Sequence, residues 1–200
     1  VRQRLVVHGT GDVSLDPRYV PALRTYGYAY AWSGLHDLFT GDDLTVVNLE
    51  CPVSNRGTRA PREFAFRCDP AALPAAREAG VDVANLANDH SGDYGPVALL
   101  DSVAHTRAAG VEPVGVGADV EAANTAVVVE RGGWRIAVHA GRPIAWGLGN
   151  GVWPTRSDAG STTAVARFVV EPDGAVHGCL LPARIVSPGH PVLTAPRACP

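Results

Sequence analysis

The first half of the chain alternates short β-branched runs with helical segments, and this alternation strongly limits the folds open to it. The helical segments, 70–79 and 96–109, each have a proline near the start and a glycine just past the end. The order strand, helix, strand, helix, strand predicts a parallel sheet with helical crossovers, which is an α/β fold. The strands are expected at residues 5–7, 44–49, 81–86 and 111–116. In the second helical segment, one face at helical spacing carries Val97, Leu100, Ala104 and Ala108.

The second half has the pattern of an antiparallel sheet. Residues 126–130 and 134–138 flank Arg-Gly-Gly, and residues 163–170 and 175–181 flank Glu-Pro-Asp-Gly. Both patterns predict β-hairpins. The expected architecture is therefore layered sheets flanked by helices, parallel in the first half and antiparallel in the second.

Size and composition exclude several classes of protein. A chain of 200 residues that is 46% hydrophobic and 18% charged is neither disordered nor too short for a core. We expect one domain over 1–187 and then a Pro-rich tail over 188–200 that forms an irregular surface strap. The net charge of −3 argues against nucleic acid as a partner, and no apolar run is long enough for a membrane span. Since the chain contains no Met, Val1 is either an unusual translation start or not the start, and we expect a mature or trimmed product.

Polar residues follow three successive predicted strands. Asp12 follows the first strand, Glu50 the second, and Asp89 with His90 the third. Ligands of open parallel sheets bind at the carboxyl ends of the strands, and carboxylate and imidazole groups are donors for Mn, Fe or Zn. Each residue also has a simpler interpretation: a turn cap for Asp12, a solvated charge for Glu50, and a capped loop residue for His90. Their equivalent positions favour a shared divalent metal site.

The four cysteines, at positions 51, 68, 179 and 199, leave the compartment open. Their spacing fits no CxxC zinc motif, and four cysteines allow three disulfide connectivities. The neighbour pairings Cys51 with Cys68 and Cys179 with Cys199 would each close a short loop. The alternative is four buried thiols in a cytosolic protein.

Several short motifs, taken in order from about residue 8 to 182, carry a family resemblance. They are GDV at 11–13, NLECPV at 48–53, FAFR at 64–67, AGVDV at 79–83, ANDH at 87–90, DYG at 93–95, VGVG at 114–117 and IAWGLGN at 144–150. In these motifs the chain resembles the CapA family, the bacterial poly-γ-glutamate capsule synthesis proteins. The resemblance implies a calcineurin-like metallophosphoesterase fold.

The resemblance also implies roles for individual residues. Asp12 matches the first metal-binding Asp of the family, and Glu50 takes the place of the metal-bridging carboxylate. His90 matches a histidine that faces the substrate and donates or relays a proton. Asp89 stands where the family normally has Asn, and its carboxylate can still bind a metal. Asp93 would orient His90 and raise its basicity.

One region departs from the family pattern. Relatives carry two further His-containing motifs between the strand at 134–138 and the segment 144–150, where this chain has only VHAGRP at 138–143. His139 is interpreted either as a remnant of the first of these motifs or as the accidental flank of a deletion. A two-metal centre therefore looks incomplete, which favours a single metal site.

Two functions from different classes follow. The first is a metal-dependent enzyme linked to poly-γ-glutamate capsule or peptide processing, in which a metal activates water or a carbonyl and His90 is the general acid or base. It would act as a hydrolase on phosphoesters or amides, or as a peptide epimerase. Arg67 and Asn150 are candidates to bind a glutamate-containing polymer or peptide. The second is a non-catalytic module that binds an anionic polymer or a capsule-assembly partner.

The expected location is extracellular or in the cell envelope, because many CapA relatives are exported, and the alternative is the cytoplasm. If the protein is exported, Cys51 and Cys68 should be bridged, with Cα atoms within about 7 Å. The bridge would hold the Glu50 loop against the FAFR segment.

Overall fold

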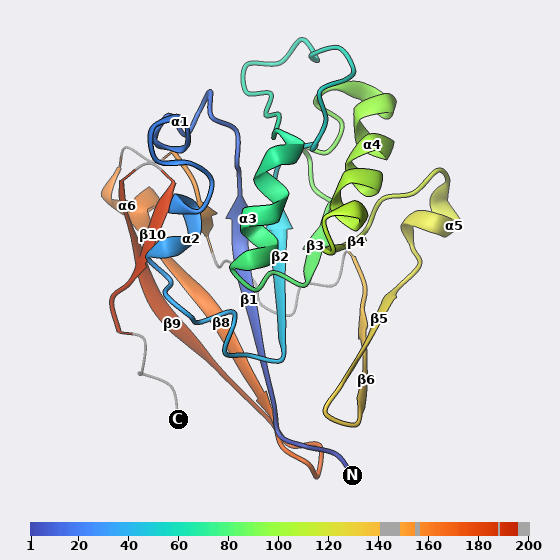
Figure 1. Ribbon diagram of the computed structural model, residues 1–200, viewed down its shortest axis with the longest axis vertical. Helices are drawn as coiled ribbons and strands as arrows, with labels where there is room; N and C mark the ends of the chain where they lie inside the picture. Colours follow the sequence, from blue (N-terminus) through green and yellow to red (C-terminus); the bar gives the residue numbers. More distant parts are fainter. Residues whose placement is uncertain (141–148, 155–156, 188, 196–200) are drawn as a thin grey trace.

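A mixed β-sheet forms the centre of the molecule in the computed structural model, which describes residues 1–140, 149–154, 157–187 and 189–195 (Figure 1). Its parallel part runs in chain order through neighbouring strands: β1 (Leu5–Val13), β2 (Leu44–Leu49), β3 (Val83–Asn85) and β4 (Glu112–Val114). These strands overlap the predicted apolar runs, but β1 continues past residue 7 to Val13, so Asp12 lies in the last part of the strand and not after it, because Asp12 and Val13 still pair with β2. The predicted parallel sheet is confirmed.

The antiparallel part extends the same sheet on the other side of β1. β8 (Thr162–Val170) pairs antiparallel with β1 and with β9 (Val176–Ser187), which confirms the second predicted hairpin. A short strand, β7 (Asn150–Val152), pairs in parallel with the end of β1 and sets Asn150 opposite Asp12. Parallel strands in the first half and antiparallel strands in the second, with flanking helices, are consistent with an α/β metallophosphoesterase-like fold.

The Pro-rich tail is more ordered than its composition suggests. Residues His190–Leu193 form strand β10, which pairs antiparallel with β9 at the edge of the sheet. The expectation of an irregular strap is wrong for this segment because an edge strand tolerates Pro191, and because His190 packs on Tyr30 with ring centroids 4.1 Å apart. Residues 196–200 lie outside the described part of the chain.

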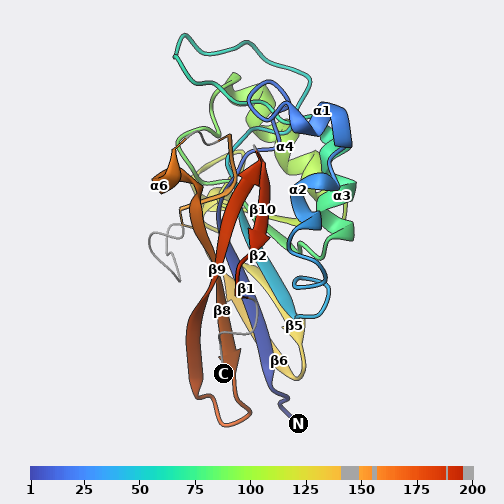
Figure 2. The same cartoon turned by 90° about the vertical axis from the view of Figure 1, so that its left-hand side faces the viewer.

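Helices cover one face of the parallel strands (Figure 2). At the start of α3, the Asp69 carboxylate accepts the Ala71 N–H, and Pro70 begins a 3-10 turn. After α3, Gly80 has φ +102°, and a Cβ there would lie 2.4 Å from the Phe39 backbone, so only glycine fits. The helices are α1 (Ala22–Tyr26), α2 (Tyr30–Ser33), α3 (Leu73–Glu78), α4 (Gly95–Ala108), α5 (Val120–Ala123) and α6 (Asp158–Ser161).

α4 packs on the sheet through a face that the sequence pattern does not favour. Its buried residues are Ala98, Ser102 and Thr106, whereas Val97 and Leu100 are 48% and 44% exposed. Small side chains allow the helix to approach closely, and the Ser102 hydroxyl accepts the buried Val53 N–H at 2.7 Å. α4 is the longest described helix at 14 residues, and none of those described is long and apolar enough to cross a membrane.

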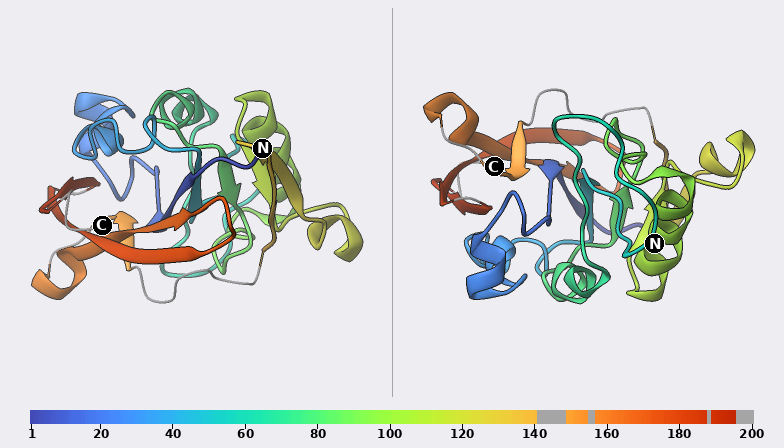
Figure 3. Two further views of the ribbon diagram at one scale, coloured as in Figure 1. Left: turned by 90° about the horizontal axis from the view of Figure 1, so that it is seen from below. Right: turned by 90° about the horizontal axis from the view of Figure 1, so that it is seen from above.

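A separate hairpin covers the opposite face of the parallel strands (Figure 3). β5 (Val127–Arg131) and β6 (Trp134–Val138) pair antiparallel, which confirms the first predicted hairpin. Its contact with the sheet forms a second, smaller core, because successive strand residues point to opposite faces. That core contains Leu44, Val83, Val114, Val129 and Val138.

Candidate metal centre

Three side chains meet where β2 and β3 end. Glu50 comes directly after β2, and Asp89 and His90 lie in the loop after β3. One carboxylate oxygen from each acid and one ring nitrogen of His90 all lie within 4.8 Å of one another. The strand-end positions therefore bring together the acids and the histidine that the sequence singles out at these two strands.

Asp12 joins this cluster through the amide of Asn48 on β2. The Asn48 Nδ2 donates to Asp12 Oδ1 at 2.8 Å and to Glu50 Oε2 at 2.5 Å. Asn85 and Asn88 donate in turn to Asn48 Oδ1, at 3.0 Å and 3.2 Å. The Asp12 and Glu50 carboxylates thus share one donor and lie on the same side of the sheet. Sequence reasoning missed Asn48, although a lone amide in an apolar strand is itself a signal.

The acids of this cluster repel one another. Burial, and then the nearby Asp12 carboxylate, raise the pKa of Glu50 to about 8. Burial also raises the pKa of Asp12 above its usual value, against the hydrogen bond from Asn48. A bound divalent cation would reverse both shifts. The donor set therefore fits such a cation.

His90 is held in place by groups outside the cluster. Its Nδ1 lies 2.7 Å from Asp93 Oδ2, and its Nε2 lies 3.5 Å from Asp89 Oδ2. Its ring also packs against Phe66, with centroids 4.3 Å apart. The Asp93 carboxylate is fully buried and accepts the Phe66 N–H at 2.7 Å. The ring therefore presents Nε2 to the acids. The catalytic roles of His90 and Asp93 stay predictions.

A disulfide ties the Glu50 loop to the Phe66 segment, which confirms the expected bridge. Cys51 and Cys68 are bonded, with Cα atoms 5.7 Å apart. Beside the bridge, the Leu15 N–H donates to the Cys68 sulfur at 3.2 Å. Cys179 is also disulfide-bonded, and Cys199 lies outside the described residues.

Three other predicted site residues make no hydrogen bond or ion pair with Glu50, Asp89 or His90 in the described part of the chain. His139 is exposed, and its Nδ1 lies 2.6 Å from the Ala140 carbonyl oxygen. The Arg67 guanidinium lies 4.3 Å from the ring centroid of Tyr94. Asn150 donates to the Gly160 carbonyl at 3.4 Å and stands opposite Asp12 across the strand pair. Their assigned roles stay predictions. Residues 141–148, where the family's further motifs are expected, lie outside the described part of the chain.

Arg62 is a residue at this site that sequence reasoning missed. Its guanidinium donates to Asp93 Oδ1 at 2.8 Å and to Asp89 Oδ2 at 3.2 Å. Arg62 belongs to the segment between β2 and α3, and this segment lies at the end of the molecule toward which β1 and β2 run (Figure 1). No motif in the sequence marks it, because its partners lie about 30 residues further along the chain.

Comparison with known proteins places this site in a family. A probable polyglutamine synthesis accessory protein of Mycobacterium tuberculosis (strain CDC 1551 / Oshkosh) is 31% identical over 175 residues, which are 80% of this chain and 46% of that protein. The capsule biosynthesis protein CapA of Bacillus anthracis is 24% identical over 139 residues, which are 68% of this chain and 34% of that protein. The chain thus spans less than half the length of these relatives. The family described as "Bacterial capsule synthesis protein PGA_cap" matches residues 6–144, well over half of the chain, and the chain therefore belongs to this family, that of CapA.

Proposed function

We propose that the protein is a metal-dependent enzyme that acts on a glutamate-containing polymer or peptide. The observation that carries the proposal is the meeting of Glu50, Asp89 and His90, whose ligand atoms lie within 4.8 Å. The three come from loops that follow neighbouring parallel strands, where ligands of such sheets bind. Acid and imidazole groups gathered at this place are typical of a catalytic metal site.

The acids of this site would hold one divalent cation such as Mn, Fe or Zn. Glu50 and Asp89 are the two acids of the cluster, and Asp12 joins them through the shared Asn48 amide. The chemistry supplied by such a cation is Lewis acidity toward a carbonyl or phosphoryl oxygen and a more acidic water. His139, exposed and outside the cluster, would join only after a change in its segment.

His90 is the proton-transfer group in this proposal. The carboxylate of Asp93 accepts hydrogen bonds, so Nδ1 carries the hydrogen and Nε2 remains free toward the cluster. Nε2 would take a proton from the nucleophile and return it to the leaving group. The packing of His90 on Phe66 restricts rotation of the ring and keeps Nε2 aimed at the acids.

The substrate class is proposed from the relatives, which are named for polyglutamine synthesis and capsule biosynthesis. A γ-glutamyl chain offers an amide carbonyl to a Lewis acid and a carboxylate to an arginine. Arg67 and Asn150 stay our candidates for contacts with it. Two reaction types suit the site: hydrolysis of an amide or phosphoester, and epimerisation by proton abstraction next to a peptide carbonyl. His90 moves the proton in both.

The test measures metal content and turnover together. Protein stripped with a chelator is reloaded with Mn or Zn and assayed on γ-glutamyl peptides, phosphoesters and peptide epimerisation substrates. Near-stoichiometric metal with turnover on one substrate is the expected result. Absence of turnover on all three classes would contradict the enzyme. His90→Ala should keep its metal, and loss of metal would make His90 a ligand instead.

A non-catalytic module that binds an anionic polymer or a capsule-assembly partner is the second candidate. The observation that favours it is the exposure of His139 outside the described cluster. Polymer binding that survives both Asp12→Asn and His90→Ala, without turnover by the wild type, would support this function. Polymer binding that needs Asp12 would count against it.

We also propose that the protein works outside the cytoplasm, at the cell surface or envelope. The bonded pair Cys51 and Cys68 supports this location, because disulfides persist in oxidising compartments. The cytoplasm is the alternative. Thiol labelling of the protein in its native cells, without reductant, separates the two: the exported protein leaves Cys51 and Cys68 unlabelled.

A further inference from the structure

We infer that Arg62 is a positioning residue of this site: it holds the Asp89 carboxylate beside Glu50 and His90, and through Asp93 it holds the His90 ring. The inference rests on the proposed metal site and adds to it a residue from a different loop. Arg62 makes three contacts there, to the Asp89 carbonyl at 2.8 Å, to Asp93 Oδ1 at 2.8 Å and to Asp89 Oδ2 at 3.2 Å.

Asp89 needs an external partner to stay in the cluster. Its side chain is 73% exposed, so nothing around it restricts its rotation by packing. The carboxylate oxygen that faces His90 Nε2 is the same oxygen that accepts from Arg62. Arg62 also bonds the backbone carbonyl of Asp89, so one planar guanidinium holds both the main chain and the side chain of that residue.

Asp93 needs Arg62 for a different reason. Its side chain is fully buried, one oxygen serves His90 and the Phe66 N–H, and the other accepts from Arg62. A buried carboxylate without a cationic partner is costly, and it would turn away from its present contacts. Because the same carboxylate fixes Nδ1 of His90, Arg62 acts on His90 through Asp93.

The variant Arg62→Lys distinguishes a positioning role of Arg62 from an effect of its positive charge alone. Lysine keeps the positive charge but loses the planar fork that reaches two acids and a carbonyl at once. If Arg62 acts only as a nearby charge, Arg62→Lys binds Mn as the wild type does, and Arg62→Ala binds Mn more tightly because a repelling cation is gone. If Arg62 positions Asp89, Arg62→Lys binds Mn about 10-fold more weakly by calorimetry.

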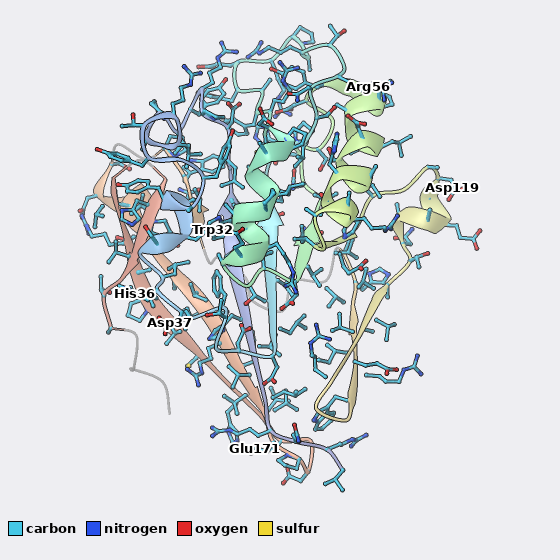
Figure 4. The ribbon with its side chains drawn as sticks, in the orientation of Figure 1. Trp32, His36, Asp37, Arg56, Asp119 and Glu171 are labelled. Carbon is cyan, nitrogen blue, oxygen red and sulfur yellow. A yellow bond between two sulfur atoms is a disulfide. The ribbon has the colours of Figure 1, made fainter. Side chains whose placement is uncertain are left out.

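The matched control is Arg56→Lys. Arg56 lies in the same loop and pairs at 3.6 Å with Asp101 on α4, at the upper edge of the molecule (Figure 4). It contacts none of the acids of the cluster, so its Mn affinity should be that of the wild type. In an Asp89→Asn background the effect of Arg62→Lys should shrink, because its main target is gone. An equal loss in both backgrounds would overturn the inference.

Amide exchange in metal-free protein gives a readout that does not need a working metal site. The Phe66 N–H donates to the Asp93 carboxylate, so its amide should exchange about 10-fold faster in Arg62→Lys than in Arg56→Lys. The Ala60 N–H donates to the Asp93 backbone carbonyl and should exchange faster if the whole Asp93 residue shifts. If the wild type binds no Mn, the proposed function fails, and exchange alone then decides the role of Arg62. Unchanged exchange would overturn the inference in either case.

Discussion

Two histidine–aspartate pairs lie at opposite ends of the parallel strands and share one geometry. His8 Nδ1 lies 2.6 Å from Asp42 Oδ2, and His90 Nδ1 lies 2.7 Å from Asp93 Oδ2. Both acid side chains are almost completely buried, at 1% and 0% exposure. The pairs differ at Nε2. That of His8 is buried with no hydrogen-bond partner among the described residues, whereas that of His90 faces Asp89.

The difference shows that a hydrogen-bonded histidine–aspartate pair does not by itself indicate catalysis. His8 and the Thr45 hydroxyl together satisfy the Asp42 carboxylate just before β2 begins, and no described acid faces His8 Nε2. His8 therefore holds β1 against the chain that leads into β2. His90 has the same support from its aspartate, but its Nε2 faces Asp89, an acid of the cluster. The burial and the surroundings of Nε2 distinguish the His8 pair, which stabilises the fold, from the His90 pair, for which we propose a role in proton transfer.

The largest expected effect is on turnover, and it tests the His90 side of the comparison. His90→Ala should lower the rate by about 10²–10⁴-fold, because a general acid or base contributes that much. The melting temperature should fall less than in His8→Ala, because the Asp93 carboxylate keeps Arg62 and the Phe66 N–H as partners. Steady-state rates and thermal melts on the same preparation check both statements. A rate within a few-fold of the wild type would remove His90 from the chemistry.

The next effect is on stability, and it tests the His8 side. His8→Ala should lower the free energy of unfolding by about 3 kcal/mol, because the buried Asp42 carboxylate then keeps the Thr45 hydroxyl but loses its histidine. Burial raises the pKa of Asp42 and the hydrogen bond to His8 lowers it, so in His8→Ala the buried carboxyl takes up a proton more readily. The loss should therefore be smaller at about pH 5 than at about pH 8.

Urea unfolding at both pH values measures this loss, with His177→Ala as the control. His177 lies exposed in the β8–β9 hairpin, so its replacement should leave the free energy of unfolding unchanged. Turnover per folded molecule should be normal in His8→Ala. A large loss of turnover in the folded variant would show that the two pairs are linked.

The third expected effect is on Mn affinity, and it compares an acid at each end of the parallel strands. Asp12→Asn should weaken Mn binding by at least about 10-fold, since removing a charged ligand costs no less than removing an outer partner. Asp42→Asn makes the same change in a carboxyl whose pKa burial also raises, but at the other end of the strands. It should leave the Mn affinity unchanged. Equal losses in both variants would mean that Asp12 acts through general destabilisation.

Much of the fold could be predicted because the signals are local. The apolar runs of β1 to β4 and the Pro and Gly at helix ends act within a few residues of where they stand. The face of α4 could not be predicted this way. Which face of α4 is buried depends on how closely the helix approaches the sheet. It also depends on the Val53 N–H, which donates a hydrogen bond to the Ser102 hydroxyl. Strand β10 could not be predicted either, because it forms only by pairing with β9 at the edge of the sheet.

The candidate site also has residues that local sequence signals locate and a residue that they do not. Asp12, Glu50 and the pair Asp89 and His90 could be located because strand ends of a parallel sheet meet at one edge. Arg62 could not, since its position depends on how the loop between Cys51 and Cys68 folds back over Asp93.

The smallest expected effect is a pH dependence at Glu50, the buried acid of the metal-free site that has no histidine partner of its own. Its pKa rises from 4.5 to about 8 in the folded protein. Between these values the folded state keeps a proton that the unfolded chain has released, so the free energy of unfolding falls as pH rises. Glu50→Gln stays neutral and removes this dependence. In chelator, from about pH 6 to about pH 8, the wild type should lose about 3 °C more in melting temperature than the variant. Adding Mn should cancel the extra loss, because the cation takes the place of the proton. Equal pH slopes in the two proteins would show that Glu50 carries no proton at neutral pH.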